Sequence, residues 1–318
     1  MRIVFMGTPD FALRQLDALL STGHTLAGVV TAPDRPAGRG RKLTSSPVKE
    51  RALRAGLPVI TPPDVNAPEA LERIAALEPD LIIVAAFGQK LGGDLLELPQ
   101  RGCFNVHASL LPKFRGAAPI NHALIAGEST TGVTIQSMAA RIDAGAIAAQ
   151  REINIAPDWN AGDLTDALAD LGAQLLVDVL DRLEAGTLRL EEQPRQGITR
   201  APRLTKSDGI IDWAKPARDI HNLVRGVTPW PGAQTTHLVQ NGKALKLLVT
   251  ATALKDAETQ AGSPGELIAL SDEGIEVACG QGVLRILKLK AAGKREMPAG
   301  DFLRGHRWQT GDRLVSSS

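Results

Sequence analysis

Short apolar runs alternate with segments of helical period through residues 1–188, and this alternation limits the fold more than any other feature. The runs are rich in Val and Ile, and they are Arg2–Met6, Thr25–Thr31, Asp80–Phe87, Gly102–Val106 and Thr131–Met138. Such runs are typical of strands that a mainly parallel sheet buries on both faces. The segments between them carry Leu at helical spacing, as from Leu164 to Leu183. We therefore predict a doubly wound α/β domain over residues 1–188.

The pattern changes after residue 188. Residues 189–206 contain two prolines and a glycine and have no sustained period, which predicts a linker. Short strand-like runs with turn residues between them follow, at Ala233–Leu238, Ala244–Ala253, Gly265–Ala269, Gly274–Cys279 and Val283–Lys290. Several short strands at close spacing are typical of a small β-barrel. We predict this barrel as a second domain over residues 207–318, with a helix over Pro216–Arg225 before its strands.

Composition excludes several classes of protein. A chain of 318 residues with 43% hydrophobic and 22% charged residues is long enough for two globular domains. A net charge of +1 argues against binding nucleic acid through overall basic charge. No apolar stretch approaches the ~18 residues of a membrane span, and no secretory signal begins the chain, so we expect a cytoplasmic protein.

The two cysteines and the first turn exclude further classes. Cys103 and Cys279 lie in separate apolar runs, which predicts buried side chains in a reducing compartment. No Cys and His cluster has metal-ligand spacing, so we predict no metal. The first turn, Gly7-Thr8-Pro9-Asp10, lacks the GxGxxG pattern, which disfavours a dinucleotide-binding enzyme.

The densest polar segment lies at the end of the predicted strand Gly102–Val106. Asn105 and His107 are two residues apart, so a strand places both side chains on one face. Open α/β sheets place their sites at such strand ends. A lone His in an apolar strand is also commonly a structural residue. The loop Ser109–Pro112 and the basic residues after it favour a functional site.

Asp143 follows the predicted strand Thr131–Met138 and precedes Ala144 and Gly145. Alone it is an ordinary turn residue. Combined with Asn105 and His107, it completes a set of amide, imidazole and carboxylate. Acyl transfer to an amine needs a base, a donor for the oxyanion, and a group that orients and stabilises the imidazole. The three residues together therefore predict an acyl-transfer site.

At these residues the chain resembles the methionyl-tRNA formyltransferase family, within the wider group of enzymes that use 10-formyltetrahydrofolate. The shared patterns are FMGTPDFA at 5–12, TAPDRPAGRGRKLTSSPVK at 31–49, NVHASLLPKFRGAAPI at 105–120, TGVTIQSM at 131–138, DAG at 143–145, PWPGA at 229–233 and AAGKREM at 291–297. The patterns around 105–120 and 143–145 are common to the wider group. The 33–49 insertion and the C-terminal domain single out the tRNA enzymes. The resemblance implies a Rossmann-like formyltransferase fold followed by an OB-like barrel.

The resemblance also implies a reaction. The formyl group of 10-formyltetrahydrofolate would pass to the amino group of methionyl initiator tRNA, with neither a metal nor a redox cofactor. Asn105 would donate to the developing oxyanion. His107, as the neutral imidazole supported by Asp143, would assist proton removal and later protonate the departing nitrogen.

Two segments would bind the folate by the same resemblance. The loop of Ser109, Leu110, Leu111 and Pro112 would line the folate site. Phe87, Gly88 and Gln89 would line the pterin side. Phe87 departs from the family, in which we expect Tyr at this position, and the chain contains no Tyr at all.

Basic residues would contact the tRNA. The loop Pro33–Pro47 is much longer than the ~2–6 residues usual for a βα loop, and it carries Arg39, Arg41 and Lys42. In the second domain we expect contacts to the RNA backbone from Lys206, Lys243, Lys246, Lys288 and Lys290. We expect Trp213 and Trp230 to lie in the core, and the chain to be a monomer.

Two other functions compete with this interpretation. A formyltransferase for a nucleotide or an amino sugar would share the chemistry, but the basic insertion at 33–49 and the separate barrel count against it. A non-enzymatic RNA-binding or structural protein could keep the same fold. The presence of Asn105, His107 and Asp143 counts against that alternative.

Overall fold

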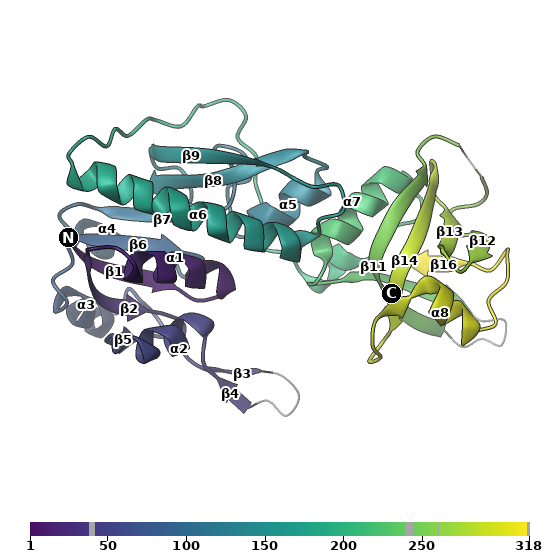
Figure 1. Ribbon diagram of the computed structural model, residues 1–318, viewed down its shortest axis with the longest axis horizontal. Helices are drawn as coiled ribbons and strands as arrows, with labels where there is room; N and C mark the ends of the chain where they lie inside the picture. Colours follow the sequence, from purple (N-terminus) through teal and green to yellow (C-terminus); the bar gives the residue numbers. More distant parts are fainter. Residues whose placement is uncertain (38–41, 239–243, 260, 317–318) are drawn as a thin grey trace. The chain divides into compact units, whose positions relative to one another are not determined.

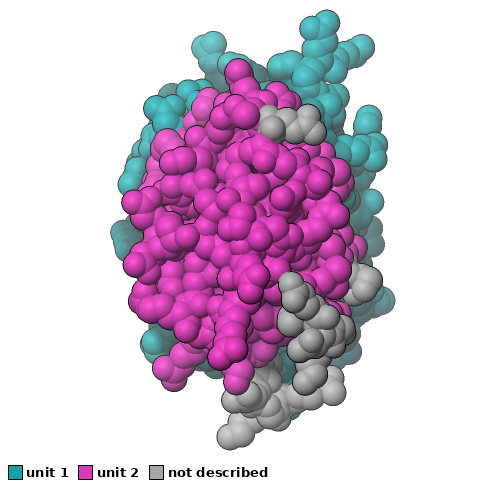
Figure 2. Space-filling view, turned by 90° about the vertical axis from the view of Figure 1, so that its right-hand side faces the viewer, with its two compact units in different colours: residues 1–119, 130–154, 165–202 teal, residues 120–129, 155–164, 203–318 magenta. Residues whose placement is uncertain are grey.

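The computed structural model describes residues 1–37, 42–238, 244–259 and 261–316. The chain forms two compact units (Figures 1 and 2). The first unit comprises Met1–Pro119, Thr130–Asn154 and Thr165–Pro202, and the second comprises Ile120–Ser129, Ile155–Leu164 and Arg203–Ser318. The chain thus enters the second unit twice before residue 188. The domain boundaries at residues 188 and 206 stay a prediction.

A seven-stranded sheet forms the centre of the first unit (Figure 1). Its strands, in spatial order, are β5 (Val59–Ile60), β2 (Thr25–Val30), β1 (Arg2–Gly7), β6 (Leu81–Ala85), β7 (Cys103–His107), β8 (Thr130–Ser137) and β9 (Ile147–Asn154). The pairs from β5 to β7 are parallel, whereas β7–β8 and β8–β9 are antiparallel. The predicted mainly parallel, doubly wound sheet is therefore confirmed.

Helices cover both faces of this sheet. They are α1 (Asp10–Leu20), α2 (Pro47–Arg54), α3 (Pro68–Ala75), α4 (Gly93–Glu97) and the greater part of α6 (Ala161–Glu184), while all of α5 (Pro119–Ile125) except its first residue belongs to the second unit. Val4 and Met6 of β1 pack in one apolar cluster with Ile74 of α3 and Leu95 of α4. Successive residues of a strand point to opposite faces, so Ile3 and Phe5 face the other side.

Helix α6 packs closely over the strands that carry the predicted site. A Cβ atom at Gly172 of α6 would lie 3.1 Å from the side chain of Val106 in β7. The Gln15 side chain of α1 donates to the Ala169 carbonyl of α6 at 2.9 Å, which joins the two helices on this face. The end of β7 therefore has a rigid, buried support behind it.

The predicted basic loop contains a small hairpin of β3 (Arg35–Ala37) and β4 (Lys42–Thr44). At its base, the Lys49 ammonium lies 2.8 Å from both carboxylate oxygens of Asp34. Ser46 accepts from the Lys49 backbone N–H and so caps α2. Arg39 and Arg41 lie outside the described residues.

The second unit contains an antiparallel sheet (Figure 1), and hydrogen bonds join the two ends of this sheet. In spatial order its strands are β12 (Leu267–Ser271), β13 (Gly274–Ala278), β14 (Val283–Ala291), β11 (Ala244–Asp256), β10 (Ala233–Leu238) and β16 (Leu314–Ser316), with β15 (Met297–Pro298) beside β14. The two ends meet where Leu314 donates to the Gly265 carbonyl at 2.8 Å and Leu267 donates to the Asp312 carbonyl at 2.9 Å. This closure confirms the predicted OB-like architecture.

Short helices accompany the barrel, namely η1 (Lys206–Gly209), α7 (Ala217–Val227) and α8 (Ala299–Arg304). Trp213 is buried and its indole N–H donates to the Thr235 hydroxyl at 2.9 Å, as the core prediction required. Trp230 is 53% exposed, so the same prediction was wrong for Trp230. The sequence identifies a large apolar side chain but not whether the fold buries it or leaves it exposed.

Both cysteines are free and buried, as predicted. Burial raises the pKa of the Cys103 thiol and of the Cys279 thiol to about 12, so neither is a ready nucleophile. Within the described ranges, no helix combines the length and apolar character that a membrane crossing requires. In the same ranges, no three His, Cys, Asp or Glu side chains gather as a metal site would need.

Candidate active site

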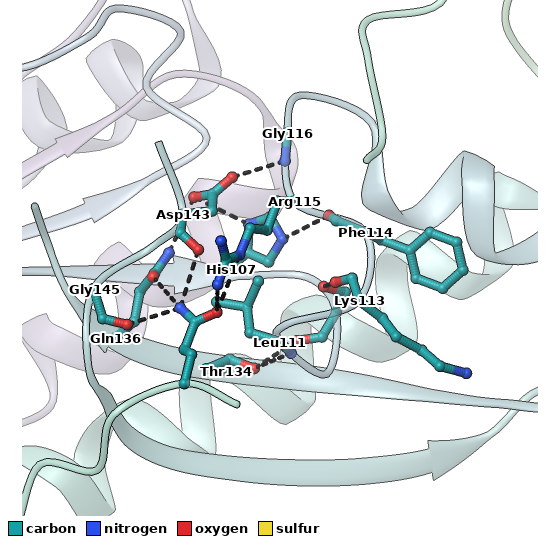
Figure 3. Close-up of polar contacts among 12 residues, drawn as sticks. His107, Leu111, Lys113, Phe114, Arg115, Gly116, Thr134, Gln136, Asp143 and Gly145 are labelled. Carbon is teal, nitrogen blue, oxygen red and sulfur yellow. Dashed lines mark hydrogen bonds and ion pairs between the residues drawn. The ribbon is translucent and has the colours of Figure 1, made fainter. Parts of the chain in front are cut away.

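His107 ends strand β7, and an oxygen atom faces each of its ring nitrogens (Figure 3). Nδ1 lies 3.6 Å from Oδ1 of Asp143, and Nε2 lies 3.0 Å from the carbonyl oxygen of Phe114. The two side chains are almost buried, with 5% of His107 and 11% of Asp143 exposed. The protonated ring can donate to both oxygens. The neutral ring can serve as a base only when one of these contacts opens.

The Asp143 carboxylate is fixed by two further donors (Figure 3). The Gly116 backbone N–H donates to Oδ2 at 2.8 Å, and the Gln136 side-chain amide donates to Oδ1 at 3.0 Å. The backbone of Asp143 is left-handed, with φ at 50°, a conformation that Asp tolerates better than most residues. The turn therefore aims the carboxylate at the imidazole.

Asn105 lies two residues before His107 on β7, opposite Gln136 of β8. Alternate residues of a strand point to the same face, so the Asn105 amide is on the His107 side of the sheet. The residue is partly exposed. In the described part of the chain its side chain has no hydrogen-bond partner, so its N–H groups can donate to a substrate oxygen.

The loop Ser109–Pro112 is shaped by polar side chains of the antiparallel strands. The Thr134 hydroxyl donates to the Ser109 carbonyl at 2.6 Å and accepts from the Leu111 N–H at 3.0 Å. Gln150 of β9 donates to the Leu111 carbonyl at 2.9 Å. Ser109 and Leu111 are buried, whereas Leu110 and Pro112 are partly exposed. Thr134 and Gln150 were not predicted from the sequence.

The segment Phe87–Gln89 follows β6, the strand beside β7. Phe87 is buried in the apolar cluster of the sheet. The Gln89 side chain accepts from the Val65 N–H at 2.8 Å and donates to the Pro62 carbonyl at 3.1 Å. Gly88 has a left-handed backbone, with φ at 87°. Phe87 and Gln89 thus hold the turn after β6 in place, through apolar packing and hydrogen bonds respectively. Their place on the pterin side stays a prediction.

The sequence assigned no role to a group of polar side chains around Asp143. This group consists of Gln136, Arg115 and Gln193, and Gln193 belongs to the segment predicted to be a linker. Burial first, and then the neighbouring Arg141 guanidinium, lower the pKa of Arg115, which the Asp143 carboxylate opposes. Gln136 is a polar residue inside the predicted apolar strand Thr131–Met138, which was a usable signal in the sequence. Gln193 has no such local signal.

The predicted RNA-contacting lysines of the barrel share one surface as far as they are described. Lys290 of β14 is in register with Leu248 of β11, and Leu248 with Gln234 of β10. The Gln234 side chain donates to the Lys206 carbonyl at 3.1 Å. By strand alternation, Lys246 and Lys288 fall on the same face as Leu248 and Lys290. Lys243 lies outside the described residues, and Lys42 begins β4.

Comparison with known proteins assigns this geometry to a family. Residues 1–180 match the formyl transferase family, and residues 203–307 match the formyl transferase C-terminal domain. The chain is 49% identical to the methionyl-tRNA formyltransferase of Geobacter metallireducens over 98% of each chain. The chain belongs to the methionyl-tRNA formyltransferase family. A second member of this family, from Bacillus licheniformis, is 46% identical over 98% of each chain.

Solved structures show the same fold in more distant proteins. HypX from Aquifex aeolicus, in complex with tetrahydrofolic acid, has a TM-score of 0.65 at 20% identity, and the alignment covers 99% of this chain and 50% of that chain. The sugar 3N-formyl transferase WlaRD has a TM-score of 0.67 at 17% identity, with 93% and 99% covered. The family membership makes this chain a formyl-transferring enzyme, as the sequence predicted.

Proposed function

We propose that this enzyme transfers the formyl group of 10-formyltetrahydrofolate to the amino group of methionyl initiator tRNA, giving N-formylmethionyl-tRNA and tetrahydrofolate. The observation that carries this proposal is the likeness to methionyl-tRNA formyltransferases over nearly the whole chain. That likeness includes the C-terminal domain at residues 203–307, which formyl transfer by itself does not require. We further propose that the enzyme works as a cytoplasmic monomer.

The chemistry follows from the site. The α-amine of the methionyl group attacks the formyl carbon, so a C–N bond forms while the carbonyl oxygen becomes an oxyanion. The partly exposed amide of Asn105 donates to this oxyanion. His107 accepts the proton that the attacking nitrogen loses. The bond from the formyl carbon to N10 of the folate then breaks, and the same proton passes to N10.

Asp143 and the Phe114 carbonyl have different roles in this cycle. The carboxylate, 3.6 Å from Nδ1, stabilises the imidazolium that forms in the first step. The carbonyl, 3.0 Å from Nε2, occupies the place of an incoming proton donor. Its contact must open when the amine arrives, so that Nε2 can face the proton that the attacking nitrogen loses.

Substrate binding is assigned to separate surfaces. The loop of Ser109, Leu110, Leu111 and Pro112, together with Phe87, Gly88 and Gln89, binds the folate. The tRNA contacts are Arg39, Arg41 and Lys42 of the hairpin and Lys206, Lys243, Lys246, Lys288 and Lys290 of the barrel. The common face of the described barrel lysines supports this assignment, because a row of cations attracts a phosphate backbone.

A formyl-transfer assay with labelled 10-formyltetrahydrofolate tests the proposal. Methionyl initiator tRNA, methionyl elongator tRNA, glycinamide ribonucleotide and a nucleotide-linked amino sugar are supplied as competing acceptors. We expect label in the initiator tRNA above all others. Label chiefly in either small molecule would overturn the proposed acceptor while leaving the formyl-transfer chemistry intact.

A further inference from the structure

Residues 191–201, predicted as part of a linker, are bonded along the edge of the active site. Glu191 exchanges two backbone hydrogen bonds with Ile147, at 2.7 and 2.9 Å. Further along, the Arg115 N–H donates to the Thr199 carbonyl at 2.9 Å, and the Ala201 N–H donates to the Arg115 carbonyl at 2.7 Å. We call residues 191–201 the strap. It connects the turn that carries Asp143 with the loop that follows His107.

Gln193 is the strap residue that reaches into the site. Gln193 is half-buried, whereas all the other residues from 191 to 200 are exposed. Its amide nitrogen lies 2.7 Å from the Gly145 carbonyl oxygen, 3.0 Å from the Asp143 carbonyl oxygen and 3.2 Å from Oε1 of Gln136. Its amide oxygen accepts from Arg115 at 2.6 and 3.1 Å.

The direction of the Gln193 amide is determined by Arg115 on one side and by the Gly145 and Asp143 carbonyls on the other. A guanidinium only donates hydrogen bonds, so the oxygen of Gln193 must face Arg115 and its NH₂ group must face the other way. That NH₂ group meets Oε1 of Gln136, so the Gln136 NH₂ group points at the Asp143 carboxylate. Without this constraint, Gln136 could turn its oxygen toward the carboxylate, which would repel it.

We propose that Gln193, oriented by Arg115, is a positioning residue for formyl transfer. It fixes the Asp143 turn directly and the Asp143 carboxylate through Gln136. The carboxylate is in turn held 3.6 Å from the His107 ring. This inference rests on the proposed function, because Asp143 acts there on the imidazolium of His107. The strap would thus support catalysis in addition to connecting two parts of the chain.

Two substitutions separate positioning from simple packing. Gln193→Ala removes the whole amide. Gln193→Glu keeps the size and the Arg115 contact but places an oxygen against the Gly145 and Asp143 carbonyls. We expect each to lower kcat by about 10- to 100-fold, because small displacements of catalytic groups have effects of this size. KM for 10-formyltetrahydrofolate should change by less than about twofold, since Gln193 touches no predicted folate residue.

The pH profile and a double substitution supply the readouts that a structural role would not move. In Gln193→Ala the acid limb of the kcat/KM profile should shift to lower pH, because the imidazolium loses a well-placed carboxylate. In a Gln136→Leu background, Gln193→Ala should lower kcat less than it does in the wild-type enzyme, since the part of its effect that passes through Gln136 is already lost while the direct contacts with the Asp143 turn remain. Gln196→Ala is the matched control, as Gln196 is an exposed glutamine of the same strap.

Wild-type enzyme is assayed first with all four acceptors, and the variants are then tested with the acceptor it uses. Absence of transfer to tRNA therefore overturns the proposed function without deciding the role of Gln193. A kcat within about twofold of wild type in both Gln193 variants would overturn the positioning role. The positioning role would also be overturned if kcat fell, the acid limb of the kcat/KM profile did not shift, and the effects of Gln193→Ala and Gln136→Leu on kcat were fully additive. If Gln193→Ala does not fold, Gln193→Glu and its cycle with Gln136→Leu decide the question.

Discussion

The imidazole of His107 has an acceptor oxygen opposite each ring nitrogen, one from the Asp143 carboxylate and one from the Phe114 carbonyl. In the proposed reaction, the Asp143 contact would stabilise the imidazolium, and substrate would displace the Phe114 contact. Both partners reach His107 from loops rather than from β7 itself. The behaviour of this residue therefore depends on loops that the rest of the unit holds in place.

Replacing His107 with Ala should lower kcat by roughly 10²–10⁴-fold, because the amine then loses its general base. The measurement is single-turnover formyl transfer with saturating folate and acceptor. His24→Ala is a suitable control, since His24 lies in the turn before β2 rather than at the end of β7, and its Nδ1 lies 3.9 Å from the Glu184 carboxylate. Turnover close to wild type in His107→Ala would remove this residue from the mechanism.

The lowered pKa of His221 in α7 should make the stability of the second unit depend on pH. Burial first, and then the nearby Arg225, lower the pKa of His221 to about 4, and its Nδ1 lies 2.9 Å from the Thr252 hydroxyl. In the unfolded chain, the His221 imidazole is protonated as the pH falls through about 6.5. In the folded chain, the same imidazole is protonated only as the pH falls through about 4. The contribution of His221 to stability is therefore complete above pH 6.5 and is lost as the pH falls toward 4.

Denaturant unfolding at several pH values between these limits measures this effect. His221→Gln, which does not titrate, should show a smaller fall in the free energy of unfolding over the same range. Identical pH dependence in the two proteins would contradict the assignment.

At the scale of elements, the β3–β4 hairpin is a projecting element with a firm base. Asp34 and Lys49 form a bidentate ion pair there, and Thr31 and Ser46 share a hydrogen bond at 2.8 Å. Burial opposes the effect, but the Lys49 ammonium holds the pKa of Asp34 below its usual value.

Arg39→Ala should raise KM for methionyl initiator tRNA while leaving KM for 10-formyltetrahydrofolate unchanged, because the contact proposed for Arg39 is with the acceptor alone. Initial rates with each substrate varied in turn give both constants. Arg54→Ala in the neighbouring helix α2 is the control, since Arg54 is an exposed cation outside the hairpin. Equal effects on both substrates would mean that the hairpin supports the fold rather than the tRNA.

At the scale of the whole molecule, the two units are interleaved along the chain. Residues 120–129 and 155–164 belong to the second unit although the sequence places them within the predicted first domain. Arg225 donates to the Trp159 and Ala156 carbonyls, and Asn121 donates to the Gly226 carbonyl at 2.7 Å. Deleting the C-terminal domain would leave these contacts unmade, so surface charge substitutions test its role more cleanly.

Lys288→Gln combined with Lys290→Gln should weaken tRNA binding. It should also reduce the slope of log affinity against log salt concentration by roughly 1 to 2 units, because binding releases fewer counterions when fewer phosphate contacts form. Filter binding over a range of salt concentrations measures this slope. Lys215→Gln is the control, because Lys215 is an exposed lysine that lies before α7 and outside the strands of the barrel. An unchanged slope would exclude these two lysines from the interface.

The sequence by itself determined the mainly parallel sheet, the barrel and the placement of Asn105 and His107 on one face of a strand. Each of these depends on local information, namely the period of apolar residues and the spacing within one strand. The same local information classified 189–206 as a linker, because prolines and a lack of period describe the segment but not what lies beside it. It also overlooked β9, whose alternating pattern is that of an edge strand with one exposed face.

Only the tertiary structure decided the antiparallel edge of the sheet, the exposure of Trp230 and the contact of Gln193 with the Asp143 turn. Gln193 and Asp143 are 50 residues apart. A polar side chain in an aperiodic segment carries no sign of its partner, since hydrogen bonds between distant segments impose no repeating pattern on the sequence. The reacting groups could therefore be proposed from spacing, whereas the groups that hold them in place emerged only once the chain had folded.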